Sequence, residues 1–105
     1  MTSTKIVLTT ASSLEEARKI GRSLVERRLA ACVNIVPQIE SIYRWQGKVE
    51  NAEEWLLLIK TTAAAFEGVC VAMRELHSYE LPECICVGIE DGSSAYLDWI
   101  AQSVD

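Results

Sequence analysis

The side chains best suited to proton transfer or ligand binding gather in one short segment of the chain. His77, the only histidine, is followed by Tyr79, Glu80 and Glu83. An imidazole can carry a proton or bind a metal ion, and nearby carboxylates can complete such a site. A histidine at the C-terminal end of a helix can also be purely structural, because the helix dipole favours a cation there. Both interpretations of His77 stay open.

The four cysteines are further candidates for chemistry. Each lies within an apolar run, and they are Cys32, Cys70, Cys84 and Cys86. Because a free cysteine in apolar surroundings behaves as a small buried hydrophobe, we expect most of them to be structural and reduced. Cys84 and Cys86 lie on one face of a strand and could bind a soft metal ion, but two ligands make a poor site. Packing in the core is therefore the favoured interpretation.

Lys60 and Cys32 are candidates for binding and for catalysis, respectively. Lys60 ends an apolar segment, so its ammonium group either reaches water or faces an anion in a pocket. Cys32 could act as a nucleophile with His77 as its base. No residue near Cys32 in the sequence would activate its thiol, so we expect no catalysis.

The elements that position these residues alternate between strand and helix. Residues 5–10 are β-branched and apolar, which is typical of a buried strand. A helix follows from Ser12 or Ser13 to about residue 28, with glutamates at the capping-box spacing. The later elements are a second helix capped by Thr61 or Thr62, a strand at residues 84–89 and a last helix from about Ser94.

A long β-hairpin is predicted in the middle of the chain. Residues 31–45 alternate in polarity, with Tyr43 and Trp45 on the same parity as the apolar positions before them. A tight turn at Gln46-Gly47 leads into a return strand over residues 48–61. Pro37 marks a bend, a bulge or an edge, because proline cannot donate to the ladder.

The return strand is apolar on both faces over residues 55–59. A strand of this kind must be covered on both sides. The helices of so short a chain cover one side, so we expect a partner subunit to cover the other. The residues assigned to this interface between subunits are Tyr43, Trp45, Trp55 and Leu57.

The order β-α-β-β-α-β-α predicts an α+β fold. It is that of a ferredoxin-like βαββαβ sandwich with a long central hairpin and an added C-terminal helix. A chain of 105 residues has room for one core, so we expect a single domain over residues 1–105.

Composition excludes several classes of partner. The net charge of −5 argues against nucleic acid or an anionic membrane as the main partner. No run approaches the ~18 apolar residues of a membrane span. The first residues lack the pattern of a signal peptide, and reduced cysteines fit a reducing compartment, so we expect a cytoplasmic protein.

Five stretches together resemble the CutA family, whose members are named for divalent-cation tolerance. The stretches are LAACVNIVP at 29–37, SIYRWQGK at 41–48, EWLLLIKT at 54–61, LHSYELPE at 76–83 and YLDW at 96–99. The resemblance implies a ferredoxin-like subunit in a tight homotrimer, with long hairpins interlocking around a threefold axis. Family members are also similar in architecture to the PII signalling proteins.

The resemblance also implies an association with copper. The ligands proposed in the family are a cysteine in the first strand and paired histidines that end the second helix. The matching positions here are Thr9, Leu76 and His77, so one ligand remains. Tight metal sites generally use three or four protein ligands. We therefore expect no tightly bound cofactor, and only weak Cu(II) binding through His77, with Glu80 or Glu83 adding an oxygen.

The leading hypothesis is a trimeric binding or signalling protein that acts in divalent metal-ion tolerance or response. Its pocket is expected at each junction between subunits, near Cys32, Lys60, His77, Tyr79 and Glu80. The alternative is a PII-like sensor of a small anionic metabolite at the subunit interface, with Lys60 as the charge partner.

Overall fold

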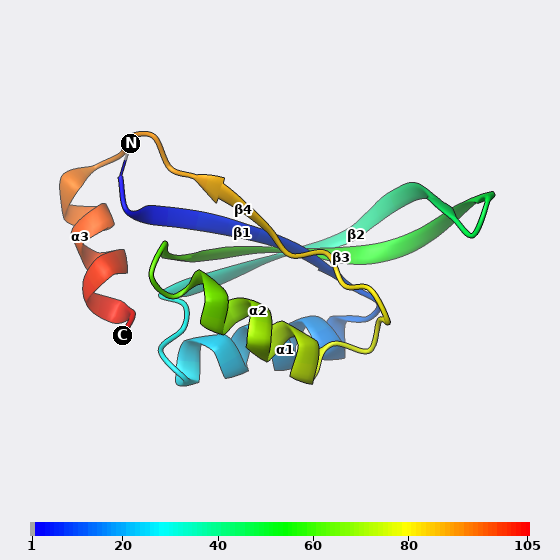
Figure 1. Cartoon of the computed structure of the whole chain (residues 1–105), viewed down its shortest axis with the longest axis horizontal. Coiled ribbons are helices and arrows are strands. Elements are labelled where there is room, and N and C mark those ends of the chain that lie inside the picture. Colours follow the sequence, from blue (N-terminus) through cyan, green and yellow to red (C-terminus); the bar gives the residue numbers. More distant parts are fainter. Residues whose placement is uncertain (1) are drawn as a thin grey trace.

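Seven helices and strands follow one another in the computed structural model, which describes residues 2–105 (Figure 1). They are β1 (Thr4–Ala11), α1 (Leu14–Glu26), β2 (Cys32–Trp45), β3 (Lys48–Thr62), α2 (Phe66–Leu76), β4 (Ile85–Gly88) and α3 (Ser94–Ser103). The strands form one antiparallel sheet in the order β2-β3-β1-β4. The predicted α+β class is confirmed. Met1, which the predicted domain 1–105 includes, lies outside the described residues.

Helix α1 begins at the predicted capping box. The Ser13 hydroxyl accepts a hydrogen bond from the Glu16 amide at 3.0 Å, and the Glu16 carboxylate accepts one from the Ser12 amide at 3.0 Å. These two bonds satisfy backbone donors that have no partner within the helix. The buried face of α1 then carries Ala17, Ile20, Gly21 and Leu24.

Helices α1 and α2 lie on the same face of the sheet, below it in Figure 1. The core between the sheet and these two helices is made of buried side chains, chiefly Val7, Ile20, Leu24, Leu57, Ile59, Val69 and Met73. A close approach of α1 to β2 depends on Gly21, since a Cβ atom there would lie 3.2 Å from Val33. The opposite face of the sheet, which α1 and α2 leave uncovered, is called the open face below.

The start of α2 differs from the prediction. Strand β3 continues to Thr62, and α2 begins at Phe66 with Ala65 as its N-cap. The prediction that Thr61 or Thr62 caps this helix is therefore wrong. The Thr61 hydroxyl instead donates to the carbonyl oxygen of Leu29 at 2.6 Å, and the Thr62 hydroxyl accepts from the Ala65 amide at 3.3 Å within the connecting turn.

The hairpin of β2 and β3 projects beyond the helices as a twisted arm (Figure 1). Its tip has positive φ at Gln46 (51°) and Gly47 (81°), the backbone that a two-residue turn between twisted strands requires. The extents of the described chain are 44 × 25 × 22 Å.

A β-bulge interrupts the arm near Pro37, one of the possibilities that the sequence indicated. Val36 pairs with Leu56 and Ile39 pairs with Glu54, so β2 contains one extra residue, and Gln38 has φ 57°. An extra residue reverses which parity faces which side of the sheet. The expectation of a single parity along residues 31–45 is therefore wrong beyond the bulge.

Three residues of β2 illustrate the reversal. Val33 and Ile35 pack against the core on the helix side. Tyr43 lies opposite Glu50, on the same side of β3 as Glu54 and therefore on the open face.

No helix within residues 2–105 is long and apolar enough to cross a membrane.

Candidate functional site

His77 ends α2 and is held by hydrogen bonds at both ring nitrogens. Its side chain is fully buried. Nε2 donates to the carbonyl oxygen of Thr10 at 2.6 Å, and Nδ1 accepts from the amide of Tyr79 at 3.0 Å. A carbonyl only accepts and an amide N–H only donates, so the ring is neutral with its proton on Nε2. Neither nitrogen is free to ligate a metal or to act as a base.

Glu16 fastens the segment after His77 to the start of α1. Its carboxylate accepts from the Ser78 amide at 2.8 Å as well as from Ser12, and Nδ1 of His77 lies 3.9 Å away. Burial alone would raise the pKa of Glu16, but the hydrogen bonds from Ser78 and Ser12 outweigh it and lower the pKa to about 2. The carboxylate therefore stays charged at neutral pH.

Tyr79 and Glu54 form a buried polar pair. The Tyr79 hydroxyl donates to Oε2 of Glu54 at 2.6 Å, and Glu54 is only 7% exposed. Burial raises the pKa of Tyr79, and the hydrogen bond and negative charge of Glu54 raise it further, with smaller effects of Glu16 and Tyr43. Tyr79 thus remains a protonated donor that holds the Glu54 carboxylate in place.

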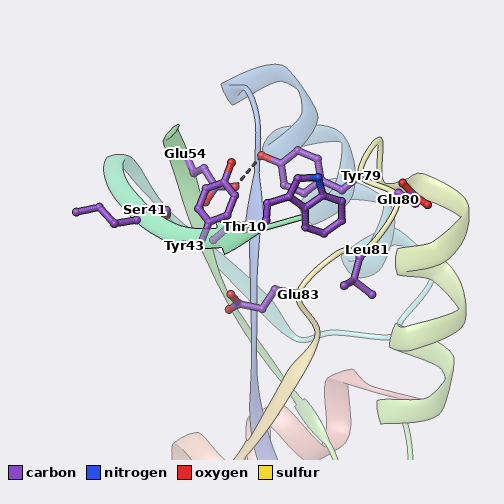
Figure 2. Close-up of a pocket in the computed structure, with 10 residues that line it drawn as sticks. Thr10, Ser41, Tyr43, Glu54, Tyr79, Glu80, Leu81 and Glu83 are labelled. Atoms are coloured by element: carbon purple, nitrogen blue, oxygen red, sulfur yellow. Dashed lines mark hydrogen bonds between the residues drawn. The ribbon is translucent and has the colours of Figure 1, made fainter. Parts of the chain in front are cut away.

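A cavity of about 610 Å³ lies beside this pair, between the arm and the segment after α2 (Figure 2). Its walls are Thr10, Ser41, Ile42, Tyr43, Trp45, Glu54, Tyr79, Glu80, Leu81 and Glu83. Figure 2 shows Tyr43 and Glu54 entering from the arm, and Tyr79, Leu81 and Glu83 from the other side. Three aromatic rings and three carboxylates are therefore present, and no basic side chain lines the cavity.

The structure divides the residues of the predicted pocket into two groups within one chain. Tyr79, Glu80 and Glu83 line the cavity, with His77 buried close behind them. Lys60 lies six residues beyond Glu54 on β3, which is about 20 Å along an extended strand. Cys32 pairs with Lys60 across β2 and β3, so these two residues form a separate group.

Asn34 connects the members of the second group on the open face. Its side-chain oxygen accepts from the Lys60 ammonium group, and the Cys32 sulfur lies 3.8 Å from the same oxygen. The thiol of Cys32 and the ring of His77 therefore each have other partners. The geometry contains no pairing of nucleophile and base between them.

The residues predicted at a subunit interface occupy three different environments. Tyr43 and Trp45 are 43% and 39% exposed and line the cavity. Trp55 is half-buried and packs against the core on the helix side. Leu57 is fully buried in that core, so its assignment to an interface is contradicted. Leu56 and Leu58, on the other parity of β3, face the open side.

The remaining cysteines lie near the edge strand β4. All four cysteines are free, and the sulfur atoms of Cys70 and Cys84 lie 3.4 Å apart. Burial raises the pKa of the Cys84 thiol to about 12, and the neighbouring Cys70 adds to the effect. Within residues 2–105 no group of three or more His, Cys, Asp or Glu side chains is arranged to hold a metal ion.

Glu54 and Thr10 are site residues that the sequence analysis did not select. Glu54 directly precedes the apolar run of β3 and shares its parity with Leu56 and Leu58. This position, next to the apolar residues 55–59, was the sequence signal that could have identified Glu54.

Comparison with known proteins gives the family. A family model described as CutA1 divalent ion tolerance protein matches residues 5–103. The chain belongs to the CutA family. The resemblance noted in the sequence is confirmed.

Relatives in the CutA family match along nearly the whole chain. The divalent-cation tolerance protein CutA of Thermus thermophilus is 50% identical over 99 residues, which is 94% of this chain and 96% of the relative. A solved structure of Cut A1 from that organism has a TM-score of 0.96 at 48% identity, covering 97% of this chain and 99% of that one.

Other CutA proteins differ in length or in their described compartment. The structure of the periplasmic divalent cation tolerance protein CutA from Archaeoglobus fulgidus has a TM-score of 0.94 at 41% identity, covering 97% of this chain and 99% of that one. The chloroplastic CutA of Arabidopsis thaliana is 43% identical over 98 residues, which is 93% of this chain and 54% of the relative. The chain thus spans about half the length of that plant relative.

Proposed function

We propose that the chain is a trimeric, non-catalytic binding or signalling protein that acts in the response to divalent metal ions, copper among them. The observation that carries the binding role is the cavity beside Tyr79 and Glu54, whose walls are fixed by hydrogen bonds. The absence of catalysis is supported by His77, since both of its nitrogens are engaged. The metal-ion context is supported by membership of a family named for divalent-ion tolerance.

The proposal of a homotrimer is supported by the open face. It carries the apolar side chains Ile6, Leu8, Val36, Leu56, Leu58, Ile85 and Val87, of which Val36, Ile85 and Val87 are 38%, 51% and 44% exposed. An apolar face of this kind is normally covered by a partner. Strand β2, fourteen residues long, is also the edge of the sheet and offers unpaired backbone groups.

We further propose that the subunit is a single ferredoxin-like domain over residues 1–105. The strand order β2-β3-β1-β4, with both crossing helices on one face, supports it. A cytoplasmic location is proposed because the cysteines are free. Fractionation of cells is the test, since the Archaeoglobus relative is described as periplasmic.

A second candidate function is a PII-like sensor of a small anionic metabolite. The observation that favours it is the cationic group of Lys60 on the open face, where a partner subunit would bring further residues. The cavity itself does not support this role, because three carboxylates line it. An anion would therefore bind at Lys60, and Lys60→Gln should abolish any anion-induced increase in the melting temperature.

Two neighbouring substitutions on β3 test the assembly. Leu58→Asp places a charge on the open face and should separate the subunits while each keeps its own helix-side core. Leu57→Asp buries a charge in that core and should prevent folding. Sedimentation of the wild type is expected to give three times the mass of one 11.7 kDa chain. A folded wild-type monomer at micromolar concentration would contradict the trimer.

The metal-ion role is tested in cells that lack the chain. Restoring the wild type should restore growth at elevated copper, and the Leu58→Asp variant should not restore it if the trimer is the active form. Equal copper sensitivity with and without the chain would contradict the proposal.

A further inference from the structure

We propose that Cys70 and Cys84 are a peroxide-sensitive pair: hydrogen peroxide converts the two thiols into a disulfide bond within one chain, and a thiol reductant restores them. The bond joins α2 to the residue that precedes β4, and so fastens the segment between them. The proposal is independent of the metal-ion role and of whatever occupies the cavity.

Both sulfur atoms lie on the helix side of the sheet. Cys70 belongs to α2, which covers that side, and Cys84 packs against the core there. The face that a partner subunit is proposed to cover is the opposite one. The contact between the two thiols is therefore made within one chain and does not involve the open face.

The two thiols are already in direct contact. Their sulfur atoms lie 3.4 Å apart, although fourteen positions separate the residues in the sequence. A disulfide bond is about 2.05 Å long, so the sulfurs must approach by about 1.4 Å, which rotation about the Cα–Cβ bonds can supply. Both residues are half-buried rather than sealed in the core, so a small oxidant can reach them.

The elements on either side keep the two thiols together. Cys70 lies within α2, and the residue after Cys84 is Ile85, which pairs with Leu8 of β1. The end of α2 is tied to β1 by the hydrogen bond between His77 and Thr10. A second thiol held at contact distance reacts far faster than one that must arrive by diffusion.

The environment of Cys84 sets the order in which the thiols react. Burial raises the pKa of the Cys84 thiol to about 12, and the hydrogen bond and charge of Cys70 add to the effect, against a smaller lowering by Arg74. The thiolate is the nucleophile, and Cys84 has almost none at neutral pH. Cys70 therefore meets the oxidant first and Cys84 reacts second. Oxidation of Cys70 to a neutral sulfenic acid then removes the contribution of its charge to the raised pKa of Cys84.

The reaction consumes one peroxide and releases two waters. The Cys70 thiolate attacks one peroxide oxygen; an S–O bond forms, the O–O bond breaks, and the departing hydroxide becomes water with the proton of the Cys70 thiol. The Cys84 sulfur then attacks the sulfenic sulfur; an S–S bond forms, the S–O bond breaks, and the second hydroxide leaves as water with the Cys84 proton. The two sulfurs lose two electrons and the peroxide gains them.

The disulfide would act on the segment that follows α2. This segment, residues 77–83, lies between the two cysteines and carries His77 and Tyr79. Closing a loop of this kind restricts the unfolded chain and so stabilises the folded one. In a reducing compartment the pair stays as two thiols, and the segment is fastened only when peroxide enters.

Peptide mapping of the intact protein tests the proposal. The wild type is treated with hydrogen peroxide at neutral pH, its remaining thiols are blocked with iodoacetamide, and it is digested with trypsin and analysed by mass spectrometry without reduction. A peptide that contains Cys70 should be linked to the one that begins after Arg74, and dithiothreitol should remove the link. The oxidised chain should run as a single chain on a non-reducing denaturing gel.

Cys86→Ser is the matched control, because the peptide after Arg74 contains both Cys84 and Cys86. Cys86 is exposed, and this variant should keep the link, whereas Cys84→Ser should lose it. Dimedone, which traps sulfenic acids, should label Cys70 in Cys84→Ser and should not label Cys84 in Cys70→Ser. Oxidised wild type should melt several degrees higher than the reduced protein, and Cys84→Ser should show no such rise.

The opposite results would overturn the pair. They are the absence of a linked peptide after peroxide treatment, a link that persists in Cys84→Ser or disappears in Cys86→Ser, and a link that joins two chains. An oxidised wild type that melts no higher than the reduced protein would overturn the fastening of the segment. None of these measurements depends on copper resistance, so failure of the metal-ion role is recorded separately.

Discussion

Nε2 of His77 lies 2.6 Å from the carbonyl oxygen of Thr10 and donates a hydrogen bond to it. The bond joins the C-terminal end of α2 to the end of β1, across 67 residues of sequence. Because Nδ1 accepts a hydrogen bond from the Tyr79 amide, the ring links β1 to the segment that follows α2. The residue that looks most like a metal ligand in the sequence is therefore built into the support of the cavity.

Copper should accordingly bind weakly. Freeing either nitrogen of His77 breaks a buried hydrogen bond at a cost of about 1–3 kcal/mol, which weakens affinity roughly 5- to 150-fold relative to an exposed histidine. Calorimetric titration with Cu(II) is expected to give an affinity far below the nanomolar range, reduced further in His77→Ala. Glu80→Gln and Glu83→Gln would show which carboxylate contributes. Nanomolar affinity, or an affinity unchanged in His77→Ala, would refute the assignment to His77.

The stability of the fold should decline in acid partly through Glu16. Its pKa is about 2 in the folded chain and near 4.5 when unfolded, so the unfolded chain takes up the proton more readily. The stabilisation is complete above about pH 4.5 and is lost as the pH falls towards 2. Urea unfolding at several pH values should show a shallower decline for Glu16→Gln than for the wild type. Glu15→Gln, in the same first turn of α1 but exposed, should keep the wild-type slope.

Two buried threonines should respond oppositely to replacement by valine. The hydroxyl of Thr9 has no hydrogen-bond partner within the described residues, whereas that of Thr61 donates to Leu29. Thr9→Val removes an unsatisfied polar atom and should raise the free energy of unfolding by about 1 kcal/mol. Thr61→Val leaves the Leu29 carbonyl without its partner and should lower it by about 1–2 kcal/mol. Denaturant titration measures both, and a loss of stability in Thr9→Val would show that its hydroxyl has a partner.

Thiol reagents should distinguish the cysteines at neutral pH. The raised pKa of Cys84, about 12, leaves almost no thiolate, so this group should react far more slowly than the exposed Cys86. Mass spectrometry after brief labelling would locate the modified residues. The native protein should react with fewer groups than the denatured chain, and rapid labelling of Cys84 would contradict its buried setting.

The hairpin, the capped first helix and the final helix could be predicted because each has a local signal. A capping box and a Gln-Gly turn act over a few residues, and the structure has both where the sequence places them. The faces of β3 could not be assigned in this way. Residues 55–59 are apolar on both parities, so the sequence does not say that Leu57 faces the helices and Leu58 the open side.

The candidate site could be predicted only in part, because residue types are visible in the sequence and long-range contacts are not. Tyr79 and Glu80 were found by residue type, and both line the cavity. Lys60 and Cys32 were grouped with them although six residues of extended strand separate Lys60 from Glu54. Glu54 was missed because its burial is produced by a segment that follows some 25 positions later. The local signal for Glu54, its position at the start of the apolar run of β3, does not show which segment covers its side chain.

Because of the bulge at Gln38, the cavity depends on the number of residues in β2 as well as on their chemistry. Deleting Gln38 would act as a frameshift in three dimensions, because every side chain in residues 39–45 would turn to the opposite side of the arm. Tyr43 would leave the side of the arm on which Glu54 lies, and the cationic side chain of Arg44 would take its place. Among relatives, a chain could therefore keep each cavity residue and still lose the cavity through one missing position.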